Sequence, residues 1–276
     1  MNLQTSDTTY RLGFIGAGKL VGSVIRGLTR AKFCPPREII ASEPNAEVRL
    51  ALRNETGIAV AADNSKVARA AEMIFLGVKP TVVLPALREI VPLLQDKVVT
   101  SLAAGVRLSS MEAIADARFM RAMTNTPSAI CRAATALARG ARTTDEDLAR
   151  VREIFNAVGI VVIVDEEQID AVTALSGSGP AFVYTVIESL AEGGKQSGLP
   201  SETAAALATQ TVLGAAQLAS ESRLSPEELR RMVVTPGGTT AAGLEAMEKH
   251  RTAEGLIAAV EAASKRGREM AKEFQS

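Results

Sequence analysis

The chain has 276 residues, 47% of them hydrophobic, and a formal net charge of zero. This length allows one large domain or two modest ones, and the apolar content is sufficient for a hydrophobic core. The balanced charge lacks the basic excess that is typical of proteins binding nucleic acid. No apolar run approaches the roughly 20 residues that span a membrane, and the polar start at residues 1–11 lacks the layout of a signal peptide.

Cysteine and histidine are scarce. The sequence has 2 cysteines, Cys34 and Cys131, and 1 histidine, His250. The cysteines form neither a metal-binding spacing nor a disulfide framework, so we expect no metal site and a cytoplasmic location. A Ser-His-Asp triad or a multi-histidine zinc site is hard to build from one histidine. If the protein is an enzyme, we expect a cofactor or the substrate to supply much of the reactivity.

The first half of the chain alternates short apolar runs with helical stretches. We expect strands at 11–16, 38–42, 57–60, 71–78, 97–102, 118–123, 134–140 and 159–166. Helices are expected between them at 19–31, 45–54, 80–94 and 144–158. The run at 71–78 is apolar almost throughout, as in a strand buried on both faces. This rhythm predicts a mostly parallel sheet covered by helices.

A glycine-rich stretch, "GFIGAGKLVG", lies where the first expected strand meets the first helix. Gly16-Ala17-Gly18 supplies the G-x-G core of a dinucleotide fingerprint, in which backbone N–H groups at a helix start receive the pyrophosphate. Val21 replaces the usual third glycine. The alternative is an ordinary tight turn without a ligand. The position of the glycines after the first strand of a β-α-β series favours dinucleotide binding.

Glu43 lies at the end of the second expected strand, where such folds carry an acidic residue. A carboxylate there can accept hydrogen bonds from both ribose hydroxyls and would repel a 2′-phosphate. Glu43 therefore favours NAD(H) over NADP(H), although a nearby lysine or arginine could accommodate the phosphate. The alternative is a solvated loop acid, which is the usual place of glutamate.

After Glu166 the strand signal disappears. Segments 167–175, 180–196, 201–221, 226–233 and 241–273 are predicted to be helical. We therefore expect an α/β fold, with a Rossmann-type dinucleotide-binding domain at residues 1–165 followed by an all-helical domain at residues 166–276. Small residues at 214–220 permit close helix packing, so this second half could also form a subunit interface.

The stretch "VVTPGGTTAAGL" (233–244) interrupts the predicted helices. Ser225 is a plausible cap for a short preceding helix that has Pro226 at its first position. After Pro236-Gly237-Gly238, Thr239 or Thr240 can cap the next helix. Free N–H groups at that helix start would make an anion site. The alternative is a loop that serves only to cap a helix.

Six stretches together resemble the pyrroline-5-carboxylate reductase family: "GFIGAGKL" (13–20), "LGVKP" (76–80), "SLAAGV" (101–106), "MTNTPSA" (123–129), "DAVTALSGSGPAF" (170–182) and "TPGGTT" (235–240). The resemblance spans nearly the whole chain. It implies an N-terminal Rossmann domain, a helical domain for substrate binding and dimerisation, and the use of NADPH or NADH. It also implies dimers that commonly assemble further, often into decamers. The implied reaction is hydride transfer to the C=N bond of 1-pyrroline-5-carboxylate, giving L-proline.

The resemblance also assigns cofactor-binding residues. By their matching positions, Ala17, Lys19 and Leu20 would line the pyrophosphate beside Gly16 and Gly18, and Asn64 would lie near the adenosine. Val78 and Lys79 fall just beyond the end of a strand, where the cofactor crevice is expected. Ala103 and Ala104 would border the nicotinamide. The alternative for Lys79 is an ordinary solvated lysine.

The substrate residues implied by the resemblance lie mainly in the loop at 235–240. The substrate carboxylate would be held by Thr235, Gly238, Thr239 and Thr240. Thr240 also matches the family's threonine near the ring nitrogen of the substrate. Thr240 and Lys79 are the expected catalytic residues. Ser176, Gly177 and Glu166 are further candidates. Their alternatives are a plain helix break at 176–180 and, for Glu166, a first-turn acid that complements a helix dipole. "NTP" (125–127) is equally a rigid loop or a ligand contact.

Rival functions remain open at this stage. One is reduction of a related cyclic imine carboxylate, since the sequence does not determine the size of the substrate pocket. Another is a catalytically inactive paralogue that binds nucleotide or proline. A β-hydroxyacid dehydrogenase shares the two-part layout, but the pair "SGSGPA" and "TPGGTT" argues against it.

Overall fold

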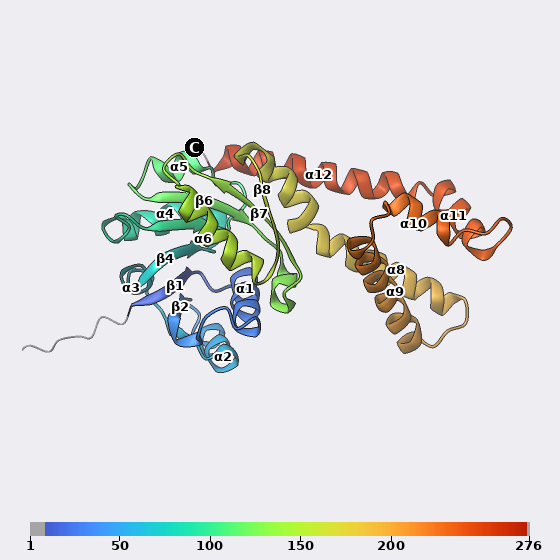
Figure 1. Ribbon diagram of the computed structural model, residues 1–276, viewed down its shortest axis with the longest axis horizontal. Coiled ribbons are helices and arrows are strands. Elements are labelled where there is room, and N and C mark those ends of the chain that lie inside the picture. The colour runs from blue at the N-terminus through green and yellow to red at the C-terminus, as the bar shows by residue number, and fades with distance from the viewer. Residues whose placement is uncertain (1–8, 275–276) are drawn as a thin grey trace, which may run out of the picture. The chain divides into compact units, whose positions relative to one another are not determined.

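The structure is a computed structural model and describes residues 9–274 (Figure 1). The prediction that the chain lacks a signal peptide concerned residues 1–11, and most of these lie outside the described range. The strands are β1 (Tyr10–Ile15), β2 (Ile39–Ser42), β3 (Ala59–Ala61), β4 (Ala71–Leu76), β5 (Val98–Ser101), β6 (Arg118–Met123), β7 (Ala133–Arg139) and β8 (Gly159–Ile163). The helices are α1 (Lys19–Arg30), α2 (Ala46–Thr56), α3 (Asn64–Ala70), α4 (Pro80–Ile90), α5 (Leu108–Glu112), α6 (Asp145–Asn156), α7 (Ile169–Val172), α8 (Gly179–Gln196), α9 (Ser201–Glu221), α10 (Pro226–Met232), α11 (Thr239–Lys249) and α12 (Thr252–Glu273).

The strands form one eight-stranded sheet in the order β3-β2-β1-β4-β5-β6-β7-β8. All neighbouring pairs are parallel except β6 and β7, which pair antiparallel. The first six positions follow the strand order of a doubly wound dinucleotide-binding fold. The strand order reverses at β1, because β2 and β3 follow on one side of it and β4 lies on the other. Such folds bind their ligands at this switch point, outside the carboxyl ends of the strands.

Apolar side chains cover both faces of the sheet, as the run at 71–78 predicted. On one face Leu12 and Phe14 of β1 pack with residues of α1 and α6. On the other face Ile15 of β1 packs with residues of α3, α4 and α5. Successive residues of β1 point to opposite faces, so one strand contributes to both clusters. The strand pairing and the two clusters together confirm a parallel-dominated α/β sheet enclosed by helices.

The chain divides into two compact units. The sheet unit runs to Ser178 and takes in the chain again from Ala263, so it includes the end of α12. The helical unit is Gly179–Ala262. Within the sheet unit, Gly267 lies against Asp170 and Phe274 packs on the cluster of α4 and α5. The domain division at residue 165 stays a prediction.

Some local predictions were wrong. The segment 241–273 is two helices, because Arg251 adopts a left-handed conformation (φ 54°) that no α-helix continues through. The helices α3 and α5 were missed; both are short, and tertiary packing rather than length stabilises such helices. The capping prediction for Ser225 is confirmed: its side chain accepts from the N–H of Glu228, and Pro226 opens α10.

Candidate active site

The β1–α1 turn carries the predicted phosphate loop. Gly16 and Ala17 donate their backbone N–H groups to the carbonyl of Ser42, both at 3.0 Å, which fixes the turn against the end of β2. Gly16 has φ +86°, and a Cβ there would lie 2.6 Å from Val78 Cγ1. The position therefore requires glycine.

The start of α1 is open to an anion. Gly18 caps the helix without a side-chain hydrogen bond, and the first turn contains no acidic residue. A Cβ on Gly18 would meet no atom of residues 9–274 within 4 Å. Because the first N–H groups of a helix have no intrahelical partner, this open space suits a pyrophosphate. The donor set thus fits a dinucleotide.

Val21 fills the place of the third glycine of the fingerprint, and Gly77 compensates for it. A Cβ on Gly77 would lie 1.9 Å from Val21 Cγ2, so only glycine at the end of β4 admits this valine. Gly77 also donates its N–H to the carbonyl of Ile15 at 2.8 Å. The close packing of helix on strand that the third glycine normally permits is preserved by Gly77, which directly follows the neighbouring strand β4.

The other predicted cofactor residues follow the carboxyl ends of neighbouring strands. Lys19 is exposed and Leu20 is half-buried at the start of α1. Val78 and Lys79 follow β4; Val78 is half-buried against Gly16, and Lys79 is exposed at the start of α4. Ala103 is buried and Ala104 half-buried after β5. The structure brings these segments to one edge of the sheet, and their contacts with a cofactor stay predictions.

The end of β2 is held by a polar network. Ser42 Oγ donates to Asn64 Oδ1 at 2.8 Å, and Asn64 Nδ2 donates to Glu89 Oε2 at 3.2 Å. Glu43 Oε1 accepts the N–H of Asn45 at 3.0 Å, so this carboxylate is turned back onto its own loop. Ser42 therefore connects Gly16 and Ala17, through its carbonyl, to the predicted adenosine residue Asn64.

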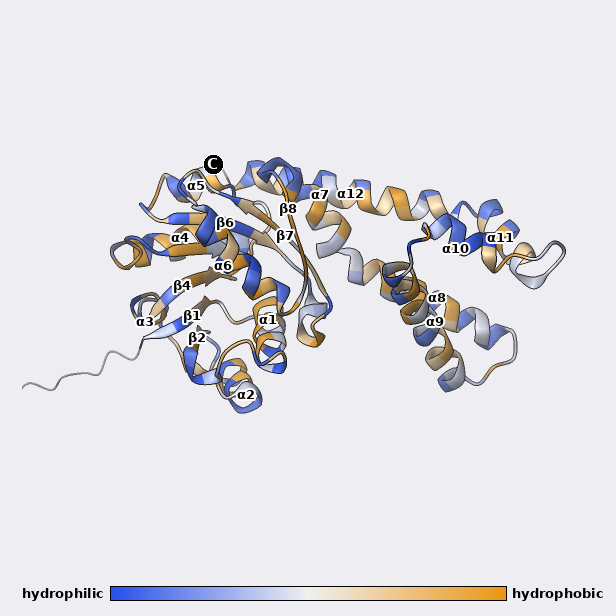
Figure 2. Cartoon of the chain, in the orientation of Figure 1, coloured by the Kyte–Doolittle hydropathy of each residue, from blue (hydrophilic) through white to orange (hydrophobic). Residues whose placement is uncertain are grey.

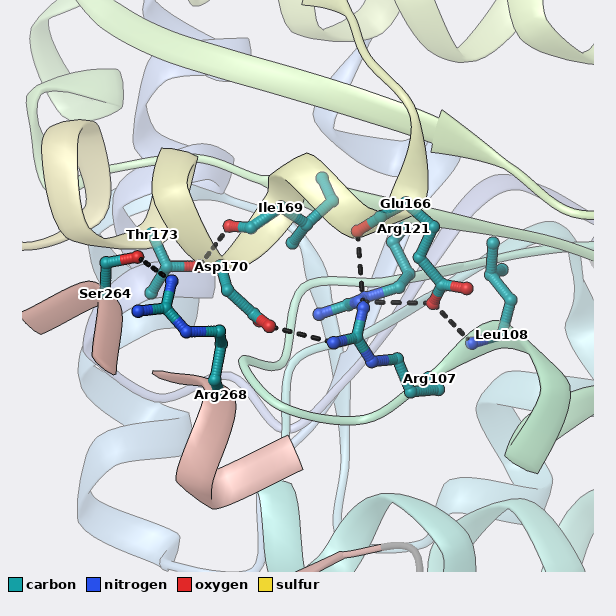
Figure 3. Close-up of polar contacts among 9 residues, drawn as sticks. All are labelled: Arg107, Leu108, Arg121, Glu166, Ile169, Asp170, Thr173, Ser264 and Arg268. Atoms are coloured by element: carbon teal, nitrogen blue, oxygen red, sulfur yellow. Dashed lines mark hydrogen bonds and ion pairs between the residues drawn. The ribbon is translucent and has the colours of Figure 1, made fainter. Parts of the chain in front are cut away.

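A buried arginine supports the loop that follows β5 (Figure 3). Arg121 of β6 is 1% exposed, and its Nη1 lies 3.1 Å from Glu166 Oε1. The same carboxylate oxygen accepts the N–H of Leu108 at 2.6 Å. Burial lowers the pKa of the Arg121 guanidinium, and the charge of Glu166 opposes that shift.

A second ion pair lies beside the first. Arg107 Nη2 is 2.9 Å from Asp170 Oδ2, and Arg107 Nη1 donates to the carbonyl of Glu166 at 3.4 Å. Figure 3 shows both arginines facing the segment that carries Glu166 and Asp170. Sequence reasoning missed these arginines. The available signal was Arg121 itself, a charge between the apolar residues Met120 and Ala122 in the middle of the strand "RFMRAM".

The glycine-rich segment before α8 begins as a π-helical turn, Thr173–Gly177. Ser176 Oγ donates to the carbonyl of Val172 at 3.1 Å, and its own carbonyl accepts Asn125 Nδ2 at the same distance. Asn125 Oδ1 accepts the N–H of Ala134. Both ends of the Asn125 amide are thus used internally, which favours the structural interpretation of "NTP". π-Helical turns are frequent at functional sites, so a ligand role for Ser176 and Gly177 stays a prediction.

The stretch 235–240 folds as a tight turn before α11. Gly238 donates its N–H to the carbonyl of Thr235 at 3.0 Å, and Gly237 has φ +72°. Pro236 at the second position and a positive-φ glycine at the third are typical of a type II turn. The prediction that Thr239 or Thr240 caps α11 is wrong, because Gly238 is the capping residue and both threonines are helical.

That correction leaves the start of α11 open. Gly238 provides no side-chain hydrogen bond, and the first turn has no acidic residue. Thr239 is exposed and Thr240 half-buried. The first N–H groups of an eleven-residue helix and two hydroxyls are therefore available to a carboxylate.

Known proteins resemble this chain along nearly its whole length. A pyrroline-5-carboxylate reductase of Pisum sativum is 41% identical over 95% of this chain and 96% of its own. The chain belongs to the pyrroline-5-carboxylate reductase family. Residues 166–270 match the model described as pyrroline-5-carboxylate reductase dimerisation. Residues 11–105 match the model described as NADP oxidoreductase, coenzyme F420-dependent.

Solved structures agree with this family. A Coxiella burnetii pyrroline-5-carboxylate reductase superposes with a TM-score of 0.86 at 34% identity, covering 95% of this chain and 98% of that one. A Plasmodium falciparum pyrroline carboxylate reductase with NADP bound gives a TM-score of 0.87 at 28% identity, covering 96% and 99%. The family implied by the sequence motifs is confirmed.

The helical unit supports self-association. Between residues 179 and 262, Ala204 and Ala208 are the buried residues, and all others are exposed or half-buried. Large apolar side chains such as Leu213, Leu218 and Ile257 are more than half exposed. Figure 2 shows these helices with extensive apolar stretches. A unit with so little core needs a partner, which agrees with its match to a dimerisation domain.

Proposed function

We propose that the chain reduces 1-pyrroline-5-carboxylate to L-proline with NAD(P)H, the last step of proline biosynthesis. The observation that best supports this proposal is the match, over 95% of the chain, to the pyrroline-5-carboxylate reductase of Pisum sativum. The β1–α1 turn supports it, because its glycines leave a helix start open to phosphate.

The reaction adds a hydride to the imine carbon and a proton to the ring nitrogen. NAD(P)H, when bound, supplies the hydride. A protonated imine is already electrophilic, so the protein needs no strong acid. This suits a chain whose single histidine, His250, is exposed at the end of α11. The main task of the protein is then to position the reactants and limit water.

The turn at 235–240 suits the substrate carboxylate. Its N–H groups at the start of α11 favour an anion, and Thr235, Gly238 and Thr239 border them. The hydroxyl of Thr240 would hydrogen-bond the ring nitrogen or relay a proton to it through water. A role for Lys79 in catalysis rests on its position after β4 and on the family resemblance.

The test is a matrix of reduced cofactors and substrates. Purified protein is assayed with NADH and NADPH against the five-membered imine carboxylate and its six-membered homologue. Turnover of 1-pyrroline-5-carboxylate in preference to the homologue supports the proposal. Preference for the larger ring favours the related imine reductase. Stabilisation of the protein by nucleotide without any turnover favours an inactive binding paralogue.

We also propose a larger assembly and a cytoplasmic location. The exposed apolar helices support pairing with a second copy, and a decamer is the larger assembly that the family resemblance implies. Light scattering at several protein concentrations tests this. The cytoplasmic proposal rests on Cys34 and Cys131, which are free thiols. Among the described helices none is long and apolar enough to cross a membrane.

A further inference from the structure

Arg49 lies beside the end of β2, where a bound dinucleotide would present the ribose of its adenosine. It is half-buried in the first turn of α2. Its side chain folds back toward the helix start, and Nη1 donates to the carbonyls of Glu43 at 2.6 Å and Pro44 at 3.2 Å. Two carbonyls thus fix the guanidinium at the edge of the sheet that carries the phosphate loop.

The neighbouring carboxylate is engaged elsewhere. Glu43 Oε1 accepts the N–H of Asn45, whose own side chain caps α2 by accepting from Glu47 and Val48. The carboxylate is therefore committed to the turn that starts the helix. The Nε and Nη2 atoms of Arg49 have no hydrogen-bond partner among residues 9–274.

We propose that Arg49 is a specificity-determining residue that binds the 2′-phosphate of NADPH. An arginine near the end of the second strand is the group by which such folds accept that phosphate. A guanidinium anchored through one nitrogen keeps its other N–H donors for phosphate oxygens. The inference rests on the proposed use of NAD(P)H and adds the residue that offsets the repulsion from Glu43.

Binding of two fragments tests this without any turnover. The probes are adenosine 2′,5′-bisphosphate, which carries the 2′-phosphate, and adenosine 5′-monophosphate, which lacks it. Arg49→Met should weaken binding of the bisphosphate about tenfold or more, because a charge-assisted hydrogen bond is lost. Binding of the monophosphate should change by less than about twofold, and Arg49→Lys should restore part of the difference.

Arg53→Met is the matched control. It removes the same charge one turn further along α2, from an exposed side chain. It should leave the ratio of the two affinities unchanged. The proposal is overturned if the wild-type protein does not prefer the bisphosphate, if Arg49→Met weakens both fragments equally, or if Arg53→Met has the same effect. Because no imine is present, failure of the proposed reaction would leave this result intact.

Discussion

Arg121 and Glu166 form an ion pair whose two members differ sharply in exposure. The guanidinium side chain is 1% exposed and the carboxylate side chain 20%. Two further nitrogens of Arg121, Nε and Nη2, are buried and have no hydrogen-bond partner within the described part of the chain. The carboxylate also holds the N–H of Leu108, so the pair connects β6 to the loop predicted to border the nicotinamide.

This asymmetry predicts unequal costs for losing either partner. Glu166→Ala leaves a buried cation without its hydrogen-bonded carboxylate and should lower the free energy of unfolding by about 3–5 kcal/mol. Arg121→Met should cost less, because water reaches the remaining carboxylate. Urea denaturation at matched protein concentration measures both. The double variant should be more stable than Glu166→Ala alone, and equal losses for the two single variants would contradict this description.

The phosphate loop offers a matched pair of glycine substitutions. Gly16→Ala should destabilise the protein by about 1–3 kcal/mol and weaken dinucleotide binding, because φ is positive there. Gly18→Ala should leave stability nearly unchanged, since φ is −67° and the added Cβ meets no atom of the described residues within 4 Å. It should still weaken NADPH binding about tenfold by filling the space left for the pyrophosphate. Thermal unfolding without nucleotide and titration with NADPH separate the effects. Unchanged affinity in Gly18→Ala would place the pyrophosphate elsewhere.

Thr240→Ala should reduce turnover more than cofactor binding. Loss of one hydrogen bond to a charged substrate corresponds to about a tenfold to hundredfold fall in kcat/KM. The dissociation constant for NADPH should stay within about twofold. Thr239→Ala removes the neighbouring, more exposed hydroxyl and should have a smaller effect on kcat. Full turnover by Thr240→Ala, or a parallel loss of NADPH affinity, would remove Thr240 from the proposed role.

Glu43→Ser should improve the use of NADPH relative to NADH. Removing a half-buried carboxylate beside a 2′-phosphate is expected to change the ratio of the two kcat/KM values by about fivefold, which corresponds to roughly 1 kcal/mol. Steady-state kinetics with both cofactors give this ratio. If it does not change, Glu43 does not act on the ribose, and the preference rests on other residues such as Arg49.

The sequence predicted the sheet well because its strands are compact apolar runs. β1 and β4 each supply both faces of the core, and their composition leaves little alternative. The antiparallel pairing of β6 with β7 could not be predicted, since the residue composition of a strand does not indicate its direction. The break at Arg251 was missed because nothing in "EKHRTAEG" resembles a usual helix stop.

The candidate site also has features that the sequence predicts and features that it does not. Gly16 and Gly18 were predictable because a phosphate loop needs glycine at fixed spacing beside a strand end. The contacts of Arg121, Arg107 and Arg49 could not be predicted from the sequence, because each contact depends on the direction of a long side chain in the folded protein. Arg107 and Asp170 are 63 residues apart in sequence, and only the folded chain brings them together. The cap of α11 was misassigned because Thr and Gly both serve at that position, and the turn geometry decides between them.

Transfer of the hydride itself tests the central claim most directly. Each of the two stereospecifically deuterated forms of NADPH is incubated with 1-pyrroline-5-carboxylate and the wild-type protein, and the product is analysed by mass spectrometry. One of the two forms should give L-proline with a single deuterium on the former imine carbon. Folded protein that binds NADPH yet yields no proline, or only unlabelled proline, with either form would contradict the proposed reaction.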